Sequence, residues 1–298
     1  MTPSSNNVSM RDITAILTHP GGAHKDDFLA CSILIAQSPV EILRREPTPD
    51  ALDDPKIAVV DIGHRHDPET LCFDHHQLDP KEHLTCALSL VLDYLGIYSS
   101  ARRYCDWLET AEWFDCRGPN KTADWLGTDR DILARLSSPI DVTLLRRFAA
   151  SEIHHRGEPV WEIMRMIGTD LLDYIETMDQ KVAALAPIIE AWPMEHPEYP
   201  DHQVVFIPRQ QPSVDDPAQG ISFVLQDLGI EKKVAVIISP DSRGAGYGLK
   251  RFDDHPACDF RQIEDQDDVT FAHKGGFIAK TTATDVERLK KLIKIART

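Results

Sequence analysis

The chain has 298 residues, of which 42% are hydrophobic and 27% are charged, and its formal net charge is −16. A chain of this length and composition can bury a large core, so we expect a globular protein of two domains rather than a disordered one. The excess of acidic residues argues against a surface that coats nucleic acid non-specifically, although a local basic groove remains compatible with it.

Compartment and membrane association are also constrained by the sequence. The six cysteines form no CxxC pair and lie mostly inside apolar runs, which is typical of a reducing compartment. The N-terminal segment Met1–Met10 is polar and lacks the apolar core of a signal peptide. No apolar run reaches the roughly 18 residues that a transmembrane helix needs. We therefore expect a cytosolic protein without a membrane partner.

The first half of the chain alternates apolar strands with helices. This alternation predicts a parallel sheet with crossover helices, in which functional groups gather beyond the carboxyl ends of the strands. The predicted elements are strands at 13–18, 40–44 and 57–61, a buried helix at 27–37, and helices at 85–95 and 101–110.

The second half begins with a helical segment at 141–190 that contains no strand-like run, and a proline-punctuated loop near 193–200 predicts a domain boundary. The elements predicted beyond it are strands at 203–207, 234–238, 247–252 and 269–272 and helices at 220–228 and 284–296. The predicted fold class is α/β. Its parts are an N-terminal parallel-sheet domain (1–140), a helical connector (141–200) and a smaller C-terminal α/β domain (201–298).

Residues of the types that bind metals gather at the strand ends and tight turns of the first domain. The central run is Asp74-His75-His76, because three polar residues after the apolar Phe73 carry a cost that needs a reason. Adjacent residues of an extended segment cannot all face one point, so the site must be completed from elsewhere in the chain. The other candidate ligands are His19, His24, Asp26, Asp61 and Asp115.

A mixed set of imidazoles and carboxylates of this size suits two first-row divalent ions, with manganese, iron, zinc and magnesium all compatible. Two ions about 3.5–4 Å apart are the usual device for displacement at phosphorus. Taken singly, the histidines could be turn or capping residues, and Asp61 and Asp115 could be caps. The joint pattern favours a metal site.

Four ordered motifs in this set resemble those of the DHH phosphoesterase superfamily. Within it, they match best the branch of the melanocyte-proliferating-gene exonuclease, whose His-x-x-Gly-Phe-Ile ending resembles residues 271–278 of this chain. The four motifs are His19-x4-His24-x-Asp26, Val59-Val60-Asp61-Ile62-Gly63, Phe73-Asp74-His75-His76-Gln77 and Phe114-Asp115-Cys116-Arg117-Gly118.

The resemblance implies an N-terminal domain of the DHH type that is a metal-dependent hydrolase, with two divalent ions as cofactors and manganese as the ion we expect. It assigns His76 to the phosphate or the leaving group as the candidate acid, and makes Asp74 a ligand or a support for its neighbour. The ligands that it implies are His19, His24, Asp26, Asp61, His75 and Asp115.

The chain departs from the family pattern at three places. Ala23 stands where the family usually has an aromatic residue, and Asp26-Asp27 stands where it has Asp-Glu. In the fourth motif, Asp115-Cys116-Arg117-Gly118 replaces Asp-Asn-Gly. The ligand atoms remain, so these departures bear on substrate choice.

The segment 239–251 of the second domain combines three glycines with three cations. It could be a simple hairpin, but such glycines let backbone N–H groups approach a phosphate, and arginine offers bidentate contacts. By resemblance, this is the substrate-binding domain. The expected binding residues are Arg243, Lys250, Arg251, His273, Lys274, Gly275 and Gly276.

These features together predict a two-metal phosphoesterase that hydrolyses phosphodiester bonds, acting as an exonuclease on short oligonucleotides. One alternative is hydrolysis of a small phosphate compound such as pyrophosphate, a cyclic dinucleotide or a nucleoside bisphosphate. Another is a catalytically silent regulator that binds nucleotide or metal. The expected partner is thus an oligonucleotide or a small phosphorylated substrate, and assembly into a homo-oligomer is left open.

Overall fold

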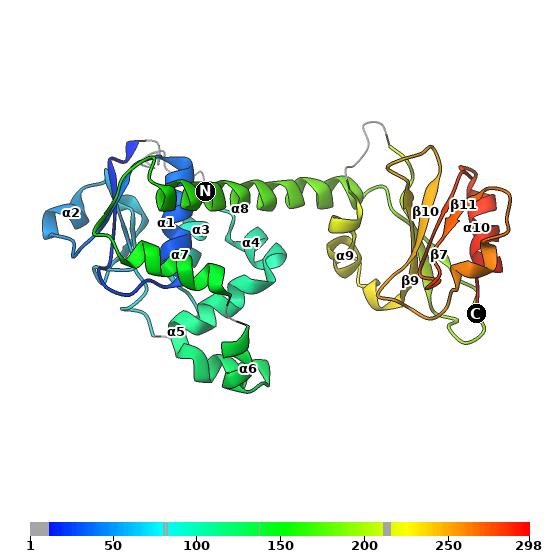
Figure 1. The fold of residues 1–298 in the computed structure, drawn as a ribbon, viewed down its shortest axis with the longest axis horizontal. Coiled ribbons are helices and arrows are strands. Elements are labelled where there is room, and N and C mark those ends of the chain that lie inside the picture. Colours follow the sequence, from blue (N-terminus) through cyan, green and yellow to red (C-terminus); the bar gives the residue numbers. More distant parts are fainter. Residues whose placement is uncertain (1–11, 80, 82, 137, 211–215) are drawn as a thin grey trace, which may run out of the picture. The chain divides into compact units, whose positions relative to one another are not determined.

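A computed structural model describes residues 12–298 except 80, 82, 137 and 211–215, and the chain packs into two compact units, Met1–Glu176 and Thr177–Thr298. Each unit is built on one six-stranded sheet (Figure 1). The predicted α/β fold class is therefore confirmed. The polar segment Met1–Met10, on which the signal-peptide prediction rests, lies outside the described residues.

The sheet of the first unit has the strand order β4-β5-β3-β1-β2-β6. Its four central strands run parallel, and β4 and β6 pair antiparallel at the two edges. The parallel register brings the carboxyl ends of β1, β2 and β3 to one edge, as predicted. The strands are β1 (Ala15–Thr18), β2 (Glu41–Arg44), β3 (Ile57–Val60), β4 (His66–Asp67), β5 (Cys72–Phe73) and β6 (Ile153–His154).

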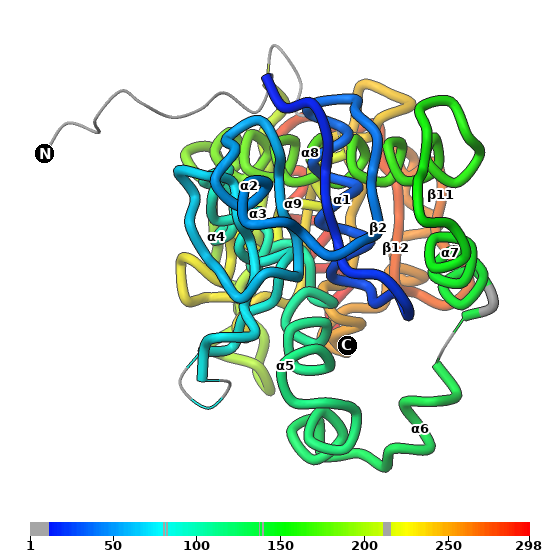
Figure 2. The backbone as a smooth tube through the Cα atoms, turned by 90° about the vertical axis from the view of Figure 1, so that its left-hand side faces the viewer, coloured from blue at the N-terminus to red at the C-terminus, as the bar shows by residue number. Residues whose placement is uncertain are grey.

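Helices cover both faces of this sheet, which is why its central strands β1 and β3 are nearly continuous apolar runs. Ile16 and Val60 pack into the larger core with α1 and α3, whereas Leu17 and Val59 pack with α2 on the other face. In both views α6 lies at the edge of the unit beyond α5 (Figure 1, Figure 2). The helices are α1 (Lys25–Gln37), α2 (Pro49–Asp53), α3 (Ala87–Tyr94), α4 (Tyr98–Tyr104), α5 (Asp106–Leu126), α6 (Arg130–Arg135), α7 (Pro139–Ala149) and α8 (Pro159–Leu185), with a 3-10 turn at Pro68–Thr70.

Several parts of the first unit differ from the sequence prediction, and α2, α6, β4 and β5 were not predicted. The segment 141–190, expected to lack strands, contributes β6, whose two residues pair with β2. A strand this short has no detectable period. The helix expected at 101–110 is two helices, and α5 continues past Gly118, whose φ of 74° kinks it. Asp115, expected at a turn, therefore lies within a helix.

The second unit has the strand order β11-β12-β10-β9-β8-β7, with only the β8 and β9 pair parallel. Helices α9 and α10 lie on opposite faces of the sheet (Figure 1). Strands β7 and β12 were not predicted. The elements are β7 (Glu190–Pro193), β8 (Gln203–Phe206), β9 (Val234–Pro240), β10 (Tyr247–Arg251), β11 (Val269–Ala272), β12 (Ile278–Thr281), α9 (Ala218–Asp227), α10 (Val286–Ile295) and 3-10 turns at Glu231–Lys233 and Phe260–Ile263.

The boundary between the compact units falls inside α8, between Glu176 and Thr177. The proline-rich loop at 193–200, where the sequence placed a boundary, follows β7, which already belongs to the second sheet. The division into a catalytic domain, a connector and a substrate domain stays a prediction. Among the described helices, none combines the length and the apolar character needed to cross a membrane.

Candidate metal centre

The loop between β1 and α1 forms one side of the candidate site. His19 directly follows β1, His24 immediately precedes α1, and Asp26 and Asp27 occupy its first turn. Asp27 Oδ1 accepts hydrogen bonds from the backbone N–H of His24 at 2.7 Å and of Phe28 at 2.8 Å. An acidic residue there satisfies free N–H groups and suits the helix dipole, so the helix start holds the loop in place.

Arg44, the last residue of β2, supports this loop. Its guanidinium is only 2% exposed and donates to the backbone carbonyls of His19 at 3.0 Å and Gly22 at 3.1 Å. It also lies 3.8 Å from Asp27 Oδ2 and 4.5 Å from the centre of the Phe148 ring. Burial lowers the pKa of Arg44. Arg44 belongs to none of the sequence motifs, and its signal in the sequence is its place at the end of a parallel strand.

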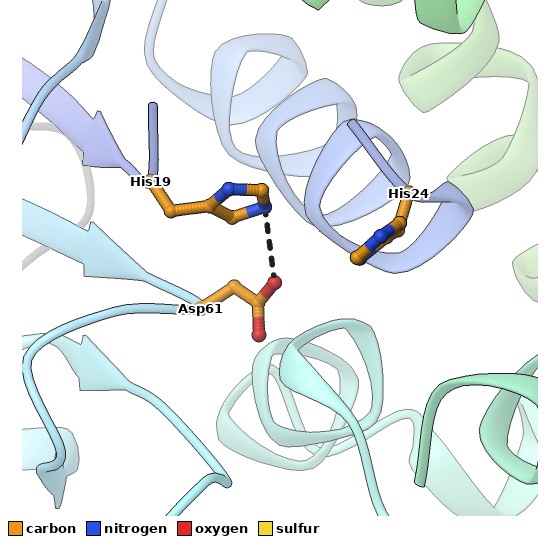
Figure 3. Close-up of side chains that lie close together, drawn as sticks. All are labelled: His19, His24 and Asp61. Atoms are coloured by element: carbon orange, nitrogen blue, oxygen red, sulfur yellow. Dashed lines mark ion pairs between the residues drawn. The ribbon is translucent and has the colours of Figure 1, made fainter. Parts of the chain in front are cut away.

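Asp61 follows β3 and lies between two sets of histidines. Its φ of 57° is in the left-handed region, which costs a non-glycine residue about 1–3 kcal/mol and recurs at functional sites. One carboxylate oxygen, Oδ2, is 3.4 Å from His19 Nε2, and the other, Oδ1, is 3.2 Å from His75 Nε2. Figure 3 shows His19, His24 and Asp61 approaching one space from the ends of β1 and β3 and the start of α1.

The run after β5 divides its three side chains among different contacts. Asp74 Oδ1 accepts the backbone N–H of His76 at 3.0 Å and lies 2.7 Å from His76 Nδ1, while Oδ2 accepts the N–H of His64 at 2.7 Å. These bonds hold the pKa of Asp74 below its usual value, although burial, the largest single influence, acts to raise it. His75 instead points inward, and its Nε2 lies 2.8 Å from Asp115 Oδ2.

Helix α5 closes the site from the opposite side. Asp115 Oδ1 lies 4.0 Å from His24 Nδ1. The thiol of Cys116 donates to the carbonyl of Thr85 and is within hydrogen-bonding range of His75. One turn earlier, the buried Glu112 anchors the helix through hydrogen bonds from the hydroxyls of Ser89 and Tyr98.

Atoms of the metal-binding types form four overlapping groups of three, each with its atoms within 4.8 Å of one another. The six ligands implied by the resemblance all occur in these groups, together with His76 and Cys116. Asp74 is in none of them, so its contacts favour the supporting role. The groups are His19, His24 and Asp61; Asp61, His75 and His76; His75, Asp115 and Cys116; and His24, Asp26 and Asp115.

Several buried polar atoms of the site make no properly directed hydrogen bond within the described part of the chain. Burial, and then the charges of Asp61 and Asp115, raise the pKa of Asp26. Burial would lower the pKa of His75, but Asp115 and Asp61 together raise it to about 12. Buried carboxylates with so few partners fit divalent cations, which would offset their repulsion. The atoms are His19 Nε2, Asp26 Oδ1 and Oδ2, Asp27 Oδ2, Asp61 Oδ1, His75 Nε2 and Asp115 Oδ2.

An open pocket of about 510 Å³ adjoins these groups. His76, whose side chain is 51% exposed, lines it together with Asp74 and His64. The volume is within the range of small-molecule sites, roughly 300–1,000 Å³. The remaining lining residues are His19, His24, Glu46, Pro47, Leu52, Asp61, Ile62 and Gly63.

The residues predicted to bind substrate in the second unit do not form one cluster. Arg243 lies in the β9–β10 turn, next to the end of β10 where Tyr247 pairs with Pro240, whereas Arg251 pairs with Val236 at the other end of this strand. Arg251 does lie beside Gly276.

Several of these polar residues form hydrogen bonds within the second unit. Arg251 Nε donates to the carbonyl of Cys258 at 2.6 Å, and His273 Nδ1 accepts the N–H of Gly275 at 2.9 Å. Arg209, which the sequence analysis missed, donates to three carbonyls of the β9–β10 turn, those of Asp241, Gly244 and Gly246. The turn is therefore part of a β-hairpin that hydrogen bonds from Arg209 stabilise.

The first unit is thus an α/β unit with a candidate histidine and aspartate metal centre at the carboxyl edge of a parallel sheet. Residues 15–94 match the protein-family model of the MYG1 exonucleases, which is described as "Uncharacterised protein family (UPF0160)". The resemblance to this family is confirmed over that span. It includes His19, His24, Asp26, Asp61 and His75 and ends before Asp115.

Solved structures with similarity to the chain include the DHH domain of a member of the s1p family of ribosomal proteins, at 13% identity and a TM-score of 0.32, covering 96% of this chain and 86% of that one. RecJ from Thermus thermophilus is similar in its complex with Mn²⁺ (14% identity, TM-score 0.24) and with Mg²⁺ (16%, 0.24). The chain is covered to 96% in both alignments and spans 52% and 49% of the RecJ chains. No curated protein shows a significant match.

Proposed function

We propose that the protein is a metal-dependent phosphoesterase that binds two divalent ions and hydrolyses phosphodiester bonds at the ends of short oligonucleotides. The observation that carries this proposal is the set of unsatisfied buried histidine and aspartate atoms that face one another beside an open pocket. The match of residues 15–94 to the MYG1 exonuclease model supports the same class of activity.

The ions would be held from two sides of the site. His19, His24 and Asp26 belong to the β1–α1 loop and helix start, His75 and Asp115 lie opposite, and Asp61 stands between the two sides. Two such ions activate a water molecule and neutralise charge on the phosphoryl and leaving oxygens. We propose manganese because imidazole and carboxylate together suit a first-row ion with oxygen preference.

His76 is the residue that we propose as the acid. Its ring borders the pocket, and Asp74 Oδ1, 2.7 Å from Nδ1, orients it as carboxylates orient catalytic imidazoles. Because Asp74 also accepts two backbone N–H groups, it cannot easily rotate away. Nε2 of His76 is then the atom that would give a proton to the leaving oxygen.

The test is hydrolysis of a short end-labelled RNA or DNA by metal-free protein supplied with Mn²⁺. We expect release of mononucleotides, and we expect His75→Ala to lower the rate by about 10³-fold or more and to reduce the number of bound ions, since a ligand is worth several kcal/mol. His66→Ala is the matched control, because this exposed histidine lies in β4 of the same sheet and should leave both quantities unchanged.

Three results would contradict this proposal in distinguishable ways. Release of phosphate only from pyrophosphate, or turnover only of a cyclic dinucleotide or nucleoside bisphosphate, would assign a small substrate to the same centre. Binding of two ions without hydrolysis of any of these compounds would make the protein a regulator. The absence of any bound or activating ion under all conditions would overturn the metal centre itself.

A further inference from the structure

Cys116 occupies the place in the fourth motif where the resemblance leads us to expect asparagine, next to the candidate ligand Asp115. Of the six cysteines, all of which the structure describes, it is the one that is partly exposed, whereas the other five are buried. Its sulfur lies within 4.8 Å of ligand atoms of both His75 and Asp115. A thiol is therefore present among atoms of the types that bind metal.

The neighbours of this thiol indicate a ligand independently of the cysteine. His75 is only 8% exposed, and its Nε2, which faces Asp115 Oδ2 at 2.8 Å, makes no properly directed hydrogen bond within the described residues. Asp115 Oδ2 is likewise unsatisfied. His75 Nε2 and Asp115 Oδ2 are thus buried atoms without a directed hydrogen bond, and the Cys116 sulfur lies beside them. Together they offer one nitrogen, one oxygen and one sulfur ligand to a metal ion.

The hydrogen bond that now engages the thiol is weak enough to be exchanged. Cys116 donates to the backbone carbonyl of Thr85, and a neutral S–H group is a weak donor. A thiolate bound to a metal ion gains far more free energy than this bond contributes. The hydrogen bond to Thr85 thus holds the Cys116 sulfur near His75 and is weak enough for a metal ion to replace it.

We propose that Cys116 is a metal ligand, which with His75 and Asp115 makes one of the two metal positions prefer a softer ion such as Zn²⁺ over Mn²⁺ or Mg²⁺. This inference rests on the metal centre of the proposed function. Thiolate ligands select zinc, whereas carboxylates and water suit manganese and magnesium. On binding, the sulfur–metal bond forms, the S–H proton goes to solvent and the hydrogen bond to Thr85 is lost.

The two positions of the centre would then differ in chemistry. The group of His19, His24 and Asp61 contains no sulfur and remains suited to a harder ion. The group of His75, Asp115 and Cys116 has one nitrogen, one oxygen and one sulfur ligand. The protein would therefore bind two kinds of divalent ion with unequal preference at neighbouring positions.

The first experiment uses Co²⁺ as a spectroscopic probe in the metal-free, full-length protein. We expect a near-ultraviolet thiolate-to-cobalt absorption band in the unmutated protein and its loss in Cys116→Ser, with cobalt still bound. Serine keeps a hydrogen-bond donor to the Thr85 carbonyl, so loss of the band in Cys116→Ser would report the loss of the sulfur ligand and not the loss of this hydrogen bond. Cys105→Ser is the control and should keep the band, because Cys105 lies at the N-cap of α5, where serine is well tolerated.

A second experiment measures metal affinity and thiol protection. We expect Cys116→Ser to weaken Zn²⁺ binding by roughly tenfold or more and Mn²⁺ binding much less. In the unmutated protein, Zn²⁺ should slow alkylation of Cys116 by iodoacetamide, whereas the same concentration of Mg²⁺ should not. This measurement needs no variant, so it decides the question even if Cys116→Ser fails to fold.

The results that would overturn the inference are separable from failure of the proposed function. Cobalt bound without a thiolate band, a band that survives in Cys116→Ser, or alkylation unaffected by Zn²⁺ would each remove Cys116 from the centre and leave the centre standing. A protein that binds no Co²⁺, Zn²⁺ or Mn²⁺ at all would overturn both.

Discussion

The metal centre of the first unit and the predicted substrate-binding residues of the second unit are both polar. Of these two described sets, only the metal centre has buried side-chain atoms without a directed hydrogen bond. Asp26 has both carboxylate oxygens buried and unsatisfied. In the second unit, Arg251 donates to a backbone carbonyl, Arg209 donates to three, and Lys280 pairs with Asp241 at 2.6 Å. The first arrangement fits a divalent cation, whereas the charged groups of the second pair with atoms of the protein itself.

Buried polar atoms without hydrogen-bond partners are therefore a stronger indication of a binding site than a high number of charged residues. A buried carboxylate without partners lowers stability by several kcal/mol unless something compensates it. The hairpin stabilised by Arg209 carries no such cost in stability, because its carbonyls already accept hydrogen bonds. If the second unit binds substrate, exposed cations such as Lys250 and Lys274 would make the contacts. Single substitutions in each unit test this difference.

Arg44→Met should produce the largest change in stability. It leaves two carbonyls without their donor and removes the buried cation 3.8 Å from Asp27, so we expect a loss of about 3 kcal/mol in the free energy of unfolding. Metal affinity should fall with it, because His19 loses its support. Denaturant unfolding and metal titration measure the two effects.

The control is Arg45→Met, which changes the adjacent, exposed arginine and should cost less than about 0.5 kcal/mol. Equal effects of the two substitutions would show that the β1–α1 loop does not depend on Arg44.

Asp74→Asn should slow hydrolysis by about 10–100-fold while leaving the number of bound ions unchanged. The amide keeps the shape but loses the charge beside His76 and can satisfy fewer of the three contacts that Asp74 makes. Steady-state kinetics with parallel metal analysis tests this. Loss of an ion in this variant would instead make Asp74 a ligand, and Asp79→Asn, an exposed neighbour, should change neither quantity.

Arg251→Met tests the second half of the comparison. If the guanidinium is structural, the variant should lose about 1–2 kcal/mol of unfolding free energy, because the carbonyl of Cys258 loses a donor, with little change in KM. Lys250→Met, at the exposed neighbouring position, is the control for stability. A raised KM at unchanged stability would support the predicted place of Arg251 in the substrate site.

Asp268→Asn should have the smallest effect, about 0.2–1 kcal/mol, because the pair with Arg288 is partly exposed. Hydrogen bonds from Arg288 lower the pKa of Asp268 from its usual 3.8. The folded state therefore favours the ionised form, so the pair stabilises the protein above about pH 4 and loses this contribution as pH falls through the lowered pKa. The difference from the unmutated protein should be present at pH 7 and vanish in acid. A difference that is the same in strong acid as at pH 7, or an equal one in Asp267→Asn, would contradict this account.

Local pattern predicted much of the fold. The strands around Ile16, Ile42 and Val59 were found because parallel strands covered by helices are continuous apolar runs. The same reasoning missed β6 and β7, since one has two residues and the other is mostly exposed, so neither carries a hydrophobic signal. Asp115 was expected at a turn because Gly118 and Pro119 follow it, yet the helix continues through a kink.

The residue types of the centre and their order along the chain could be predicted from the sequence, because motif spacing and the polarity of Asp74-His75-His76 are local properties. Which side chains meet depends on the tertiary structure. Arg44 reaches a carbonyl 22 residues away and Cys116 one 31 residues away. The contacts of Asp74 with His76, which favour its supporting role, also appear only in the folded chain. Contacts of this kind depend on how the elements pack, and no periodicity in the chain records that packing.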